Sequence, residues 1–199
     1  MTKKQPDLTN LSQGSVESDH GSQSLQGPAG IQPRPGQVIC GDIGMRIDHH
    51  GVWHYQGSPI ARKELVKLFS TVLRRDTDGA HWLITPAEMA PVQVDDAPYL
   101  AVALDAAGTG AAQTIRFRTN IDAEVTLSAD HPLRVDTDPD THEPAPYIRL
   151  DHGLEAKLNR PVFYELVEMA VEEHIKRAHL LGVWSAGDFH PIGDSPPED

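Results

Sequence analysis

The sequence predicts an α+β protein of two domains that contain an internally duplicated strand–turn–strand–helix–strand unit. Two segments about a hundred residues apart read alike, RIDHHG at 46–51 and RLDHG at 149–153. Each is followed by a proline, by the tripeptide Glu-Leu-Val and, after similar gaps, by a tryptophan, Trp82 or Trp184. Because self-similarity indicates architecture more reliably than a short motif does, we predict two related units.

Composition favours an acidic cytoplasmic protein without disulfides. The 199 residues carry a formal net charge of −12 and a single cysteine, Cys40, which excludes an intramolecular disulfide and a cysteine-based zinc site. No apolar run is long enough for a signal peptide or a membrane span, so we expect no membrane partner. Residues 88–199 hold 21 acidic and 8 basic side chains, which disfavours nucleic-acid binding by this half.

Four segments follow from composition and pattern. Residues 1–38 are rich in Ser, Gln, Gly and Pro, and their few apolar side chains do not offset the entropy of ordering, so we predict a disordered tail. Residues 39–87 are predicted to form a small α+β domain, and residues 88–192 a β-rich domain with a helix. Residues 193–199 are predicted to be a frayed acidic end.

The first domain should contain a hairpin followed by a helix and a strand. These elements are predicted in chain order as strand 45–48, strand 52–56, helix 60–75 and strand 82–85. Ser58 is expected to cap the helix. Pro59 suits its first turn, because an N–H missing there leaves no hydrogen bond unmade.

The second domain should consist mainly of strands. They are predicted within 91–104 and at 114–119, 124–127, 133–135, 147–150, 154–158 and 182–185. In 114–119 apolar residues alternate with arginines, so one face should be buried. Asn159 is expected to cap a second helix that has Pro161 in its first turn and an apolar face reaching Val171.

The polar clusters point to no metal site, no catalytic residue and no cofactor. His49, His50 and His54 lie in and after a turn, where adjacent side chains face opposite ways, so turn polarity explains them better than metal binding. The acidic loop 136–140 lacks the glycine and glutamate of a calcium-binding loop. No nucleophile stands in a recognisable catalytic motif, so the sequence favours a protein that is not an enzyme.

A basic stripe on the first helix has three readings. Lys63, Lys67 and Arg74 fall on the face opposite the apolar residues. Such a stripe is typical of a solvated helix face, but it also suits phosphates or an acidic protein surface. A third reading pairs it with the acidic outer face of the second helix.

A series of short motifs resembles the bacterial family known as domain of unknown function 1285. The motifs are, in chain order, GSPI at 57–60, LVKLF at 65–69, LITP at 83–86, VDDAPY at 94–99, FRTN at 117–120, HPLR at 131–134 and GLEA at 153–156. The resemblance covers about residues 40–190. It implies two α+β domains with an internal duplication, of which the C-terminal one is superficially like a pleckstrin-homology barrel. It also implies a role in bacterial signalling, with a protein or nucleic-acid ligand near the domain interface.

The leading hypothesis is a non-catalytic binding module whose ligand lies between the two units. Polar and aromatic residues near turns and repeat ends are the expected contacts, and they are Arg46, Arg62, Lys63, Asp96, Tyr99, Asn120, His131, Arg149 and Tyr164. Neither a small-molecule ligand nor a choice between a protein and a nucleic-acid partner follows from the sequence.

The alternative is a small metal-dependent hydrolase or transferase. It would use the neighbouring carboxylates Asp95 and Asp96 together with His131. In a strand, however, neighbouring side chains point to opposite faces, and the turn directed by Pro98 explains the acidic pair equally well.

Overall fold

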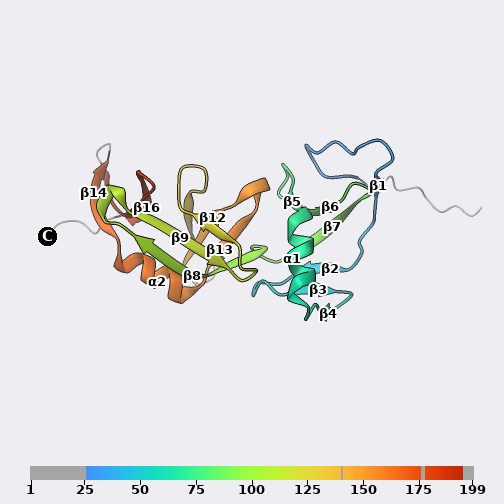
Figure 1. Ribbon diagram of the computed structural model, residues 1–199, viewed down its shortest axis with the longest axis horizontal. Helices are drawn as coiled ribbons and strands as arrows, with labels where there is room; N and C mark the ends of the chain where they lie inside the picture. The colour runs from blue at the N-terminus through green and yellow to red at the C-terminus, as the bar shows by residue number, and fades with distance from the viewer. Residues whose placement is uncertain (1–25, 140, 176–177, 195–199) are drawn as a thin grey trace, which may run out of the picture.

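The computed structural model describes residues 26–139, 141–175 and 178–194, which form two sheet-rich domains side by side along the long axis of the molecule (Figure 1). The fold is mixed α+β, with mostly strands and two α-helices among the described residues, so the predicted class is confirmed. No helix in the described part of the chain has the length and apolarity needed to cross a membrane. Residues 1–25 of the predicted tail and residues 195–199 of the predicted frayed end lie outside the described ranges.

The N-terminal domain is one seven-stranded sheet with a helix, α1 (Lys63–Val72), packed against it (Figure 1). Its strands are β1 (Val38–Ile39), β2 (Met45–Ile47), β3 (Trp53–Tyr55), β4 (Ser58–Pro59), β5 (Leu73–Arg75), β6 (His81–Ile84) and β7 (Glu88–Val94). The strand order is β4-β3-β2-β7-β6-β5, and β1 pairs with β7. The buried face carries Met45, Ile47 and Trp53, from the predicted hairpin, beneath the helix.

The first helix begins later than predicted, and Ser58 is not its cap. Ser58 and Pro59 form β4, which pairs with β3 across a two-residue turn. Both turn residues, Gln56 and Gly57, have positive φ, as the tight turns that match the twist of a β-hairpin require. The helix is instead preceded by Arg62, whose side chain makes no capping hydrogen bond. Hairpin closure therefore replaces the predicted cap.

Two predicted boundaries of this domain differ from the structure. A division between residues 87 and 88 would separate β7 from β1, β2 and β6, with which it pairs in one sheet. The described end of the predicted tail is already attached to the domain. There Ala29 N donates to Asp76 Oδ2 at 3.0 Å, and Ala29 O accepts from Thr77 N at 3.2 Å.

The C-terminal domain combines two sheets with one α-helix, α2 (Arg160–Glu168). The larger sheet has the order β10-β9-β8-β13-β12-β11, and the smaller one has the order β14-β15-β16. The larger sheet contains β8 (Tyr99–Ala107), β9 (Thr114–Thr119), β10 (Glu124–Thr126), β11 (Leu133–Thr137), β12 (Pro144–Arg149) and β13 (Glu155–Leu158). The smaller sheet contains β14 (Val171–Ile175), β15 (Ala178–Ser185) and β16 (Asp188–Asp194).

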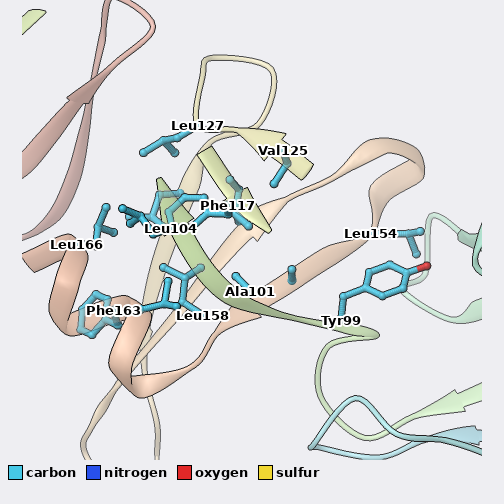
Figure 2. Close-up of a cluster of buried hydrophobic side chains, with 14 of the residues drawn as sticks. Tyr99, Ala101, Leu104, Phe117, Val125, Leu127, Leu154, Leu158, Phe163 and Leu166 are labelled. Carbon is cyan, nitrogen blue, oxygen red and sulfur yellow. The ribbon is translucent and has the colours of Figure 1, made fainter. Parts of the chain in front are cut away.

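The core of this domain lies between α2 and the larger sheet (Figure 2). Phe163 and Leu166 of the helix lie over apolar side chains of β8 and β13, and Phe117 of β9 extends the cluster. The predicted alternation of β9 is confirmed, because Ile115 and Phe117 are buried while the intervening arginines are exposed. Each such side chain contributes about 1.5–3 kcal/mol when fully buried.

The second helix begins as predicted but ends sooner. Asn159 caps it by accepting a hydrogen bond from Val162 N at 3.0 Å, and Pro161 lies in the first turn. The helix ends at Glu168, and Val171, which we placed on its apolar face, begins β14. The reason is tertiary, since residues 171–175 pair in register with β15. The strands β14 and β16 were not predicted.

The two repeated segments share local structure but not sheet assembly. Gly51 and Gly153 close their hairpins with φ of +69° and +73°. Each hairpin leads to a helix and then to three antiparallel strands whose middle strand carries Trp82 or Trp184. In the N-terminal domain these three strands join the hairpin in one sheet through the parallel pair β2–β7. In the C-terminal domain the hairpin pairs with β8 instead, and the three strands form a separate sheet.

Candidate functional site

The link between the domains is fixed by two neighbouring carboxylates that hold opposite sides. Asp95 accepts hydrogen bonds from Arg46 of β2, including one from Nε at 2.9 Å. Asp96 accepts from Tyr147 Oη at 2.8 Å and from Lys157 Nζ at 2.6 Å, both in the C-terminal domain. The pair therefore serves as a two-sided anchor. The two carboxylates bind separate partners, so they do not share a proton as a catalytic carboxylate pair does.

A cluster of charges joins α1 to the turn between β9 and β10. Asp122 lies in that turn with φ of +64° and contacts Lys63 Nζ at 2.8 Å and Lys67 Nζ at 2.9 Å. Hydrogen bonds from these two lysines lower the pKa of Asp122 to about 2. Two cations of the predicted basic stripe are thus neutralised by the neighbouring domain.

We call the contacts that Asp122, Glu155 and Asn120 make across the domains the seam. Besides the Asp122 cluster, it contains a second ion pair and a contact with a glycine. Glu155 Oε2 lies 3.4 Å from Arg75 Nη1 of β5. Asn120 Nδ2 donates to Gly51 O at 3.1 Å, and Asn120 Oδ1 accepts from Leu100 N at 3.2 Å. A Cβ on Gly51 would lie 2.7 Å from Asn120 Nδ2, so this approach requires the glycine.

Beside the seam, a cavity of about 450 Å³ opens between α1 and the larger C-terminal sheet; we call it the interdomain cleft. Its lining combines hydroxyl, imidazole, carboxylate and apolar groups, which are Ser70, Tyr99, Thr119, Ile121, Ala123, Glu124, Val125, Thr126, Ser128, His131, Leu150, Asp151, His152 and Leu154. Ser70 comes from the N-terminal domain and the others come from the C-terminal domain. The cleft is therefore completed only when both domains are in place.

Two groups give the cleft defined hydrogen-bonding chemistry. Tyr99 is 3% exposed, and burial raises the pKa of its phenol well above the ordinary value, although a hydrogen bond with Ser70 opposes the shift. The phenol is thus protonated at neutral pH. His131 Nδ1 lies 3.2 Å from Arg149 O, and because a carbonyl only accepts, Nδ1 must donate. While the ring carries a single proton, that proton is on Nδ1, and Nε2 is left as the acceptor.

The cleft has an acidic character. Among the described residues that line it are two carboxylates, Glu124 and Asp151, but no lysine or arginine. Glu124 is paired with Arg116 at 3.4 Å. A second interdomain cavity, of about 490 Å³, is lined by Arg75, Arg149, Asp76, Asp78 and Glu155 together with Thr77, Gly79 and Gly153. Apart from two glycines, every residue that lines this second cavity has a polar or charged side chain, whereas the cleft also has apolar side chains in its walls.

The nine predicted contact residues are distributed over several places. Tyr99 and His131 line the cleft, Lys63 and Asn120 lie at the seam, and Asp96 lies in the link. Arg46 binds Asp95 of the link and also lines a smaller N-terminal cavity. The others lie elsewhere: Arg149 lines the second cavity, Tyr164 lines a cavity beside α2, and Arg62 is exposed before α1. The positions of turns along the chain do not determine which turns lie close together in the fold, so the predicted residues do not form one site.

Sequence reasoning missed twelve of the fourteen residues that line the cleft, and Ser70 and His152 illustrate why. Ser70 is a single polar residue near the end of α1, and no sequence motif marks it as a binding residue. His152 lies inside the repeated motif, and its φ of +60° marks the turn. That turn position was the signal that could have identified it.

The three histidines of the first hairpin divide into a contacting pair and a separate residue, so His49 and His50 do not face opposite ways as predicted. His54 Nε2 lies 3.0 Å from Asp48 Oδ2, while the rings of His49 and His50 contact each other with centroids 3.9 Å apart. Nowhere in the described ranges do three His, Cys, Asp or Glu side chains come close enough to hold a metal ion.

Comparison with protein families decides the relationship of the chain. Residues 35–97 match the N-terminal domain of unknown function (DUF1285), and residues 98–192 match the C-terminal domain of proteins of unknown function (DUF1285). The chain belongs to the DUF1285 family. The division at 97/98 coincides with the anchored link, ten residues beyond the predicted boundary.

Two solved DUF1285 structures resemble this one. The DUF1285 family protein from Silicibacter pomeroyi DSS-3 is 36% identical, with a TM-score of 0.73 over 86% of this chain and 91% of that chain. The DUF1285 family protein from Shewanella baltica OS155 is 28% identical, with a TM-score of 0.52 over 63% of this chain and 91% of that chain. No curated protein matches the chain.

Proposed function

We propose that this DUF1285 protein is a non-catalytic binding module that receives a segment of a partner protein in the interdomain cleft. The observation that carries the proposal is a cavity completed by both domains, whose lining includes the Tyr99 phenol and the His131 ring. A few placed polar groups on a partly apolar lining are typical of a ligand site.

The alternative of a hydrolase or transferase lacks a shared reaction centre. Asp95 is bound to Arg46, and Asp96 is bound to Tyr147 and Lys157. Neither carboxylate lines the cleft that His131 lines. General acid–base chemistry requires groups within hydrogen-bond reach of the same reacting atom, and these three groups face different partners.

Charge favours a protein segment over nucleic acid. The described lining of the cleft has no lysine or arginine to neutralise phosphates, and Asp122 occupies Lys63 and Lys67 on α1. The apolar groups Ile121 and Leu154 suit side chains of a peptide, and the exposed carboxylate of Asp151 suits a basic residue within it. We therefore propose a peptide with both apolar and basic residues as the ligand.

Three finer features are proposals with separate support. A role in bacterial signalling and a pleckstrin-homology-like C-terminal domain rest on the family resemblance. Cytoplasmic location rests on the single cysteine. Origin of both domains from one copied segment is supported by the matching glycine turns and by the tryptophan on the middle strand of each meander.

Peptide selection tests the proposed function. The full chain is used to select binders from a random peptide library, and their affinity is measured for the wild type and for Ala123→Trp. Ala123 is exposed and lines the cleft, so the indole should fill the cavity without disturbing the core. Ala111→Trp is the matched control, because Ala111 is exposed in the same domain and lines none of the cavities described above.

Selected peptides should contain Lys or Arg beside apolar residues, and Ala123→Trp should weaken them at least about tenfold, equivalent to 1.4 kcal/mol. The control should bind as the wild type does. Selected peptides that bind both variants equally would place the ligand outside the cleft and contradict the proposal.

A further inference from the structure

The sheet of β14, β15 and β16 lies at the end of the C-terminal domain away from the N-terminal domain (Figure 1). Two histidines of this sheet face each other. His174 of β14 and His179 of β15 are direct partners in the antiparallel ladder. His174 Nδ1 and His179 Nε2 are hydrogen-bonded at 3.0 Å, with the rings edge-on at 88° and their centroids separated by 4.3 Å. A metal ion held by both nitrogens would replace the proton that they share. Both residues are exposed, so the pair is accessible to solvent.

The spacing of these two nitrogens suits a particular coordination geometry. Imidazole nitrogen binds first-row divalent metals at about 2.0–2.1 Å. Two nitrogens 3.0 Å apart then subtend an angle of about 95° at the metal. This is close to the right angle between neighbouring ligands in square-planar or tetragonal Cu²⁺ and Ni²⁺ sites, whereas tetrahedral zinc requires a wider angle.

The protein supplies only these two ligands from the residues that the structure describes. Glu173 is occupied, because its Oε1 accepts the indole N–H of Trp184 at 3.0 Å. Within the ranges that the structure describes, no third His, Cys, Asp or Glu completes a metal-binding group. The remaining coordination positions would thus belong to water or to an external ligand.

The local fold fixes the backbone positions that carry the two rings. Residues 171–175 pair in continuous register with β15. The indole of Trp184 also packs edge-on against Phe189 of β16, with ring centroids 5.5 Å apart. A site whose ligands are already positioned by paired strands loses little conformational entropy when the metal binds.

We propose that His174 and His179 form a two-histidine site for a divalent metal ion that prefers square-planar coordination, and that Cu²⁺ is the ion bound most tightly. Affinity for nitrogen ligands rises along the first-row series to Cu²⁺, and the angle set by the hairpin adds to that preference. The site is separate from the interdomain cleft and does not depend on the proposed function.

Titration with copper alone tests the site. Cu²⁺ is added to the full chain, and binding is followed by calorimetry and by electron paramagnetic resonance, which reports the nitrogens bound to the metal. One tight Cu²⁺ per chain with two imidazole nitrogens is expected.

Variants assign the signal to these residues. His174→Ala and His179→Ala should each weaken Cu²⁺ binding at least about tenfold, because each removes one ligand. His49→Ala is the control, since His49 lies next to another exposed histidine in the N-terminal domain, and it should leave the tight site unchanged. Circular dichroism without metal verifies that all variants are folded. Tight binding that survives His174→Ala, or that is lost in His49→Ala, would overturn the proposal.

Discussion

The two domains share a succession of hairpin, helix and three-stranded antiparallel meander, but they assemble it differently. In the N-terminal domain the hairpin β2–β3 and the meander β5–β6–β7 share one sheet. In the C-terminal domain β8 takes the place beside the hairpin β12–β13, and the meander β14–β15–β16 stands alone. The local pattern thus determines hairpin, helix and meander, whereas the available partner strand determines the sheets.

The two helices differ in the same way. The second helix, α2, has a side-chain cap and buries Phe163 and Leu166 in the core of its own domain. The first helix, α1, has no side-chain cap and buries only Val66 fully, and it directs Lys63 and Lys67 to a carboxylate of the other domain. Thus α2 is chiefly a core element, and α1 also belongs to the seam.

The largest expected effect separates core from surface positions on the helices. Leu166 is 0% exposed and Leu68 on α1 is 62% exposed. Leu166→Ala should lower the free energy of unfolding of the C-terminal domain by about 3 kcal/mol, because it removes buried methyl groups and leaves a cavity. Leu68→Ala should change stability by less than about 0.5 kcal/mol. Urea unfolding measures both, and equal losses would contradict the distinction between the helices.

The next effect concerns the N-terminal sheet and pH. Burial, helped by the charge of Arg75, lowers the pKa of His81 to about 4. Between pH 6.5 and about 4 the unfolded chain binds a proton that the folded chain does not, so stability falls as the pH decreases through this range. The loss should be about 2 kcal/mol once partial solvent exposure is allowed for.

His81→Gln should flatten this part of the pH profile in thermal unfolding. The variant and the wild type are compared at pH 7 and pH 4.5. A profile with the same slope in both would assign the acid sensitivity to another group.

Helix capping gives a smaller contrast between the domains. Asn159→Ala removes the acceptor for Val162 N and should cost about 1 kcal/mol. Ser58→Ala should have almost no effect, because Ser58 lies in β4 and not at the start of α1. Chemical denaturation of both variants measures the free energy of unfolding. A larger loss of stability for Ser58→Ala than for Asn159→Ala would support the cap that the sequence predicts at Ser58.

The smallest effect on stability is expected at the seam, where the partners are exposed. Asp122 has its pKa lowered to about 2 by Lys63 and Lys67, so its contribution is present above pH 4 and is lost as the pH falls toward 2. Asp122→Asn should remove this dependence and its sensitivity to salt. Unfolding curves at low and high NaCl measure it, and an unchanged salt dependence in the variant would argue against the ion pair.

Much of the fold could be predicted from local chemistry. The alternation in β9, the glycine turns and the Asn159 cap are set by neighbouring residues, and the structure contains all three. Ser58 was misassigned because a hairpin turn at Gln56 and Gly57 competes for the same backbone.

The candidate site was harder to predict because it forms from distant segments. Tyr99 and His131 could be selected as polar or aromatic residues near turns. Ser70 enters the cleft only because α1 packs against the other domain, and the distribution of Lys63, Asp96 and Asn120 over seam and link is equally tertiary. Sequence spacing carries no information about such meetings.

The central claim is that a polar seam holds the two domains in the arrangement that forms the cleft. Spin labels at Ala87→Cys and Ala111→Cys, in a Cys40→Ser background, place one exposed probe on each domain. Pulsed electron resonance then measures the distance distribution with and without Asp122→Asn and Glu155→Gln. The account predicts a narrow distribution in the parent and a broader one when both carboxylates are neutralised. An equally narrow distribution in both would contradict it.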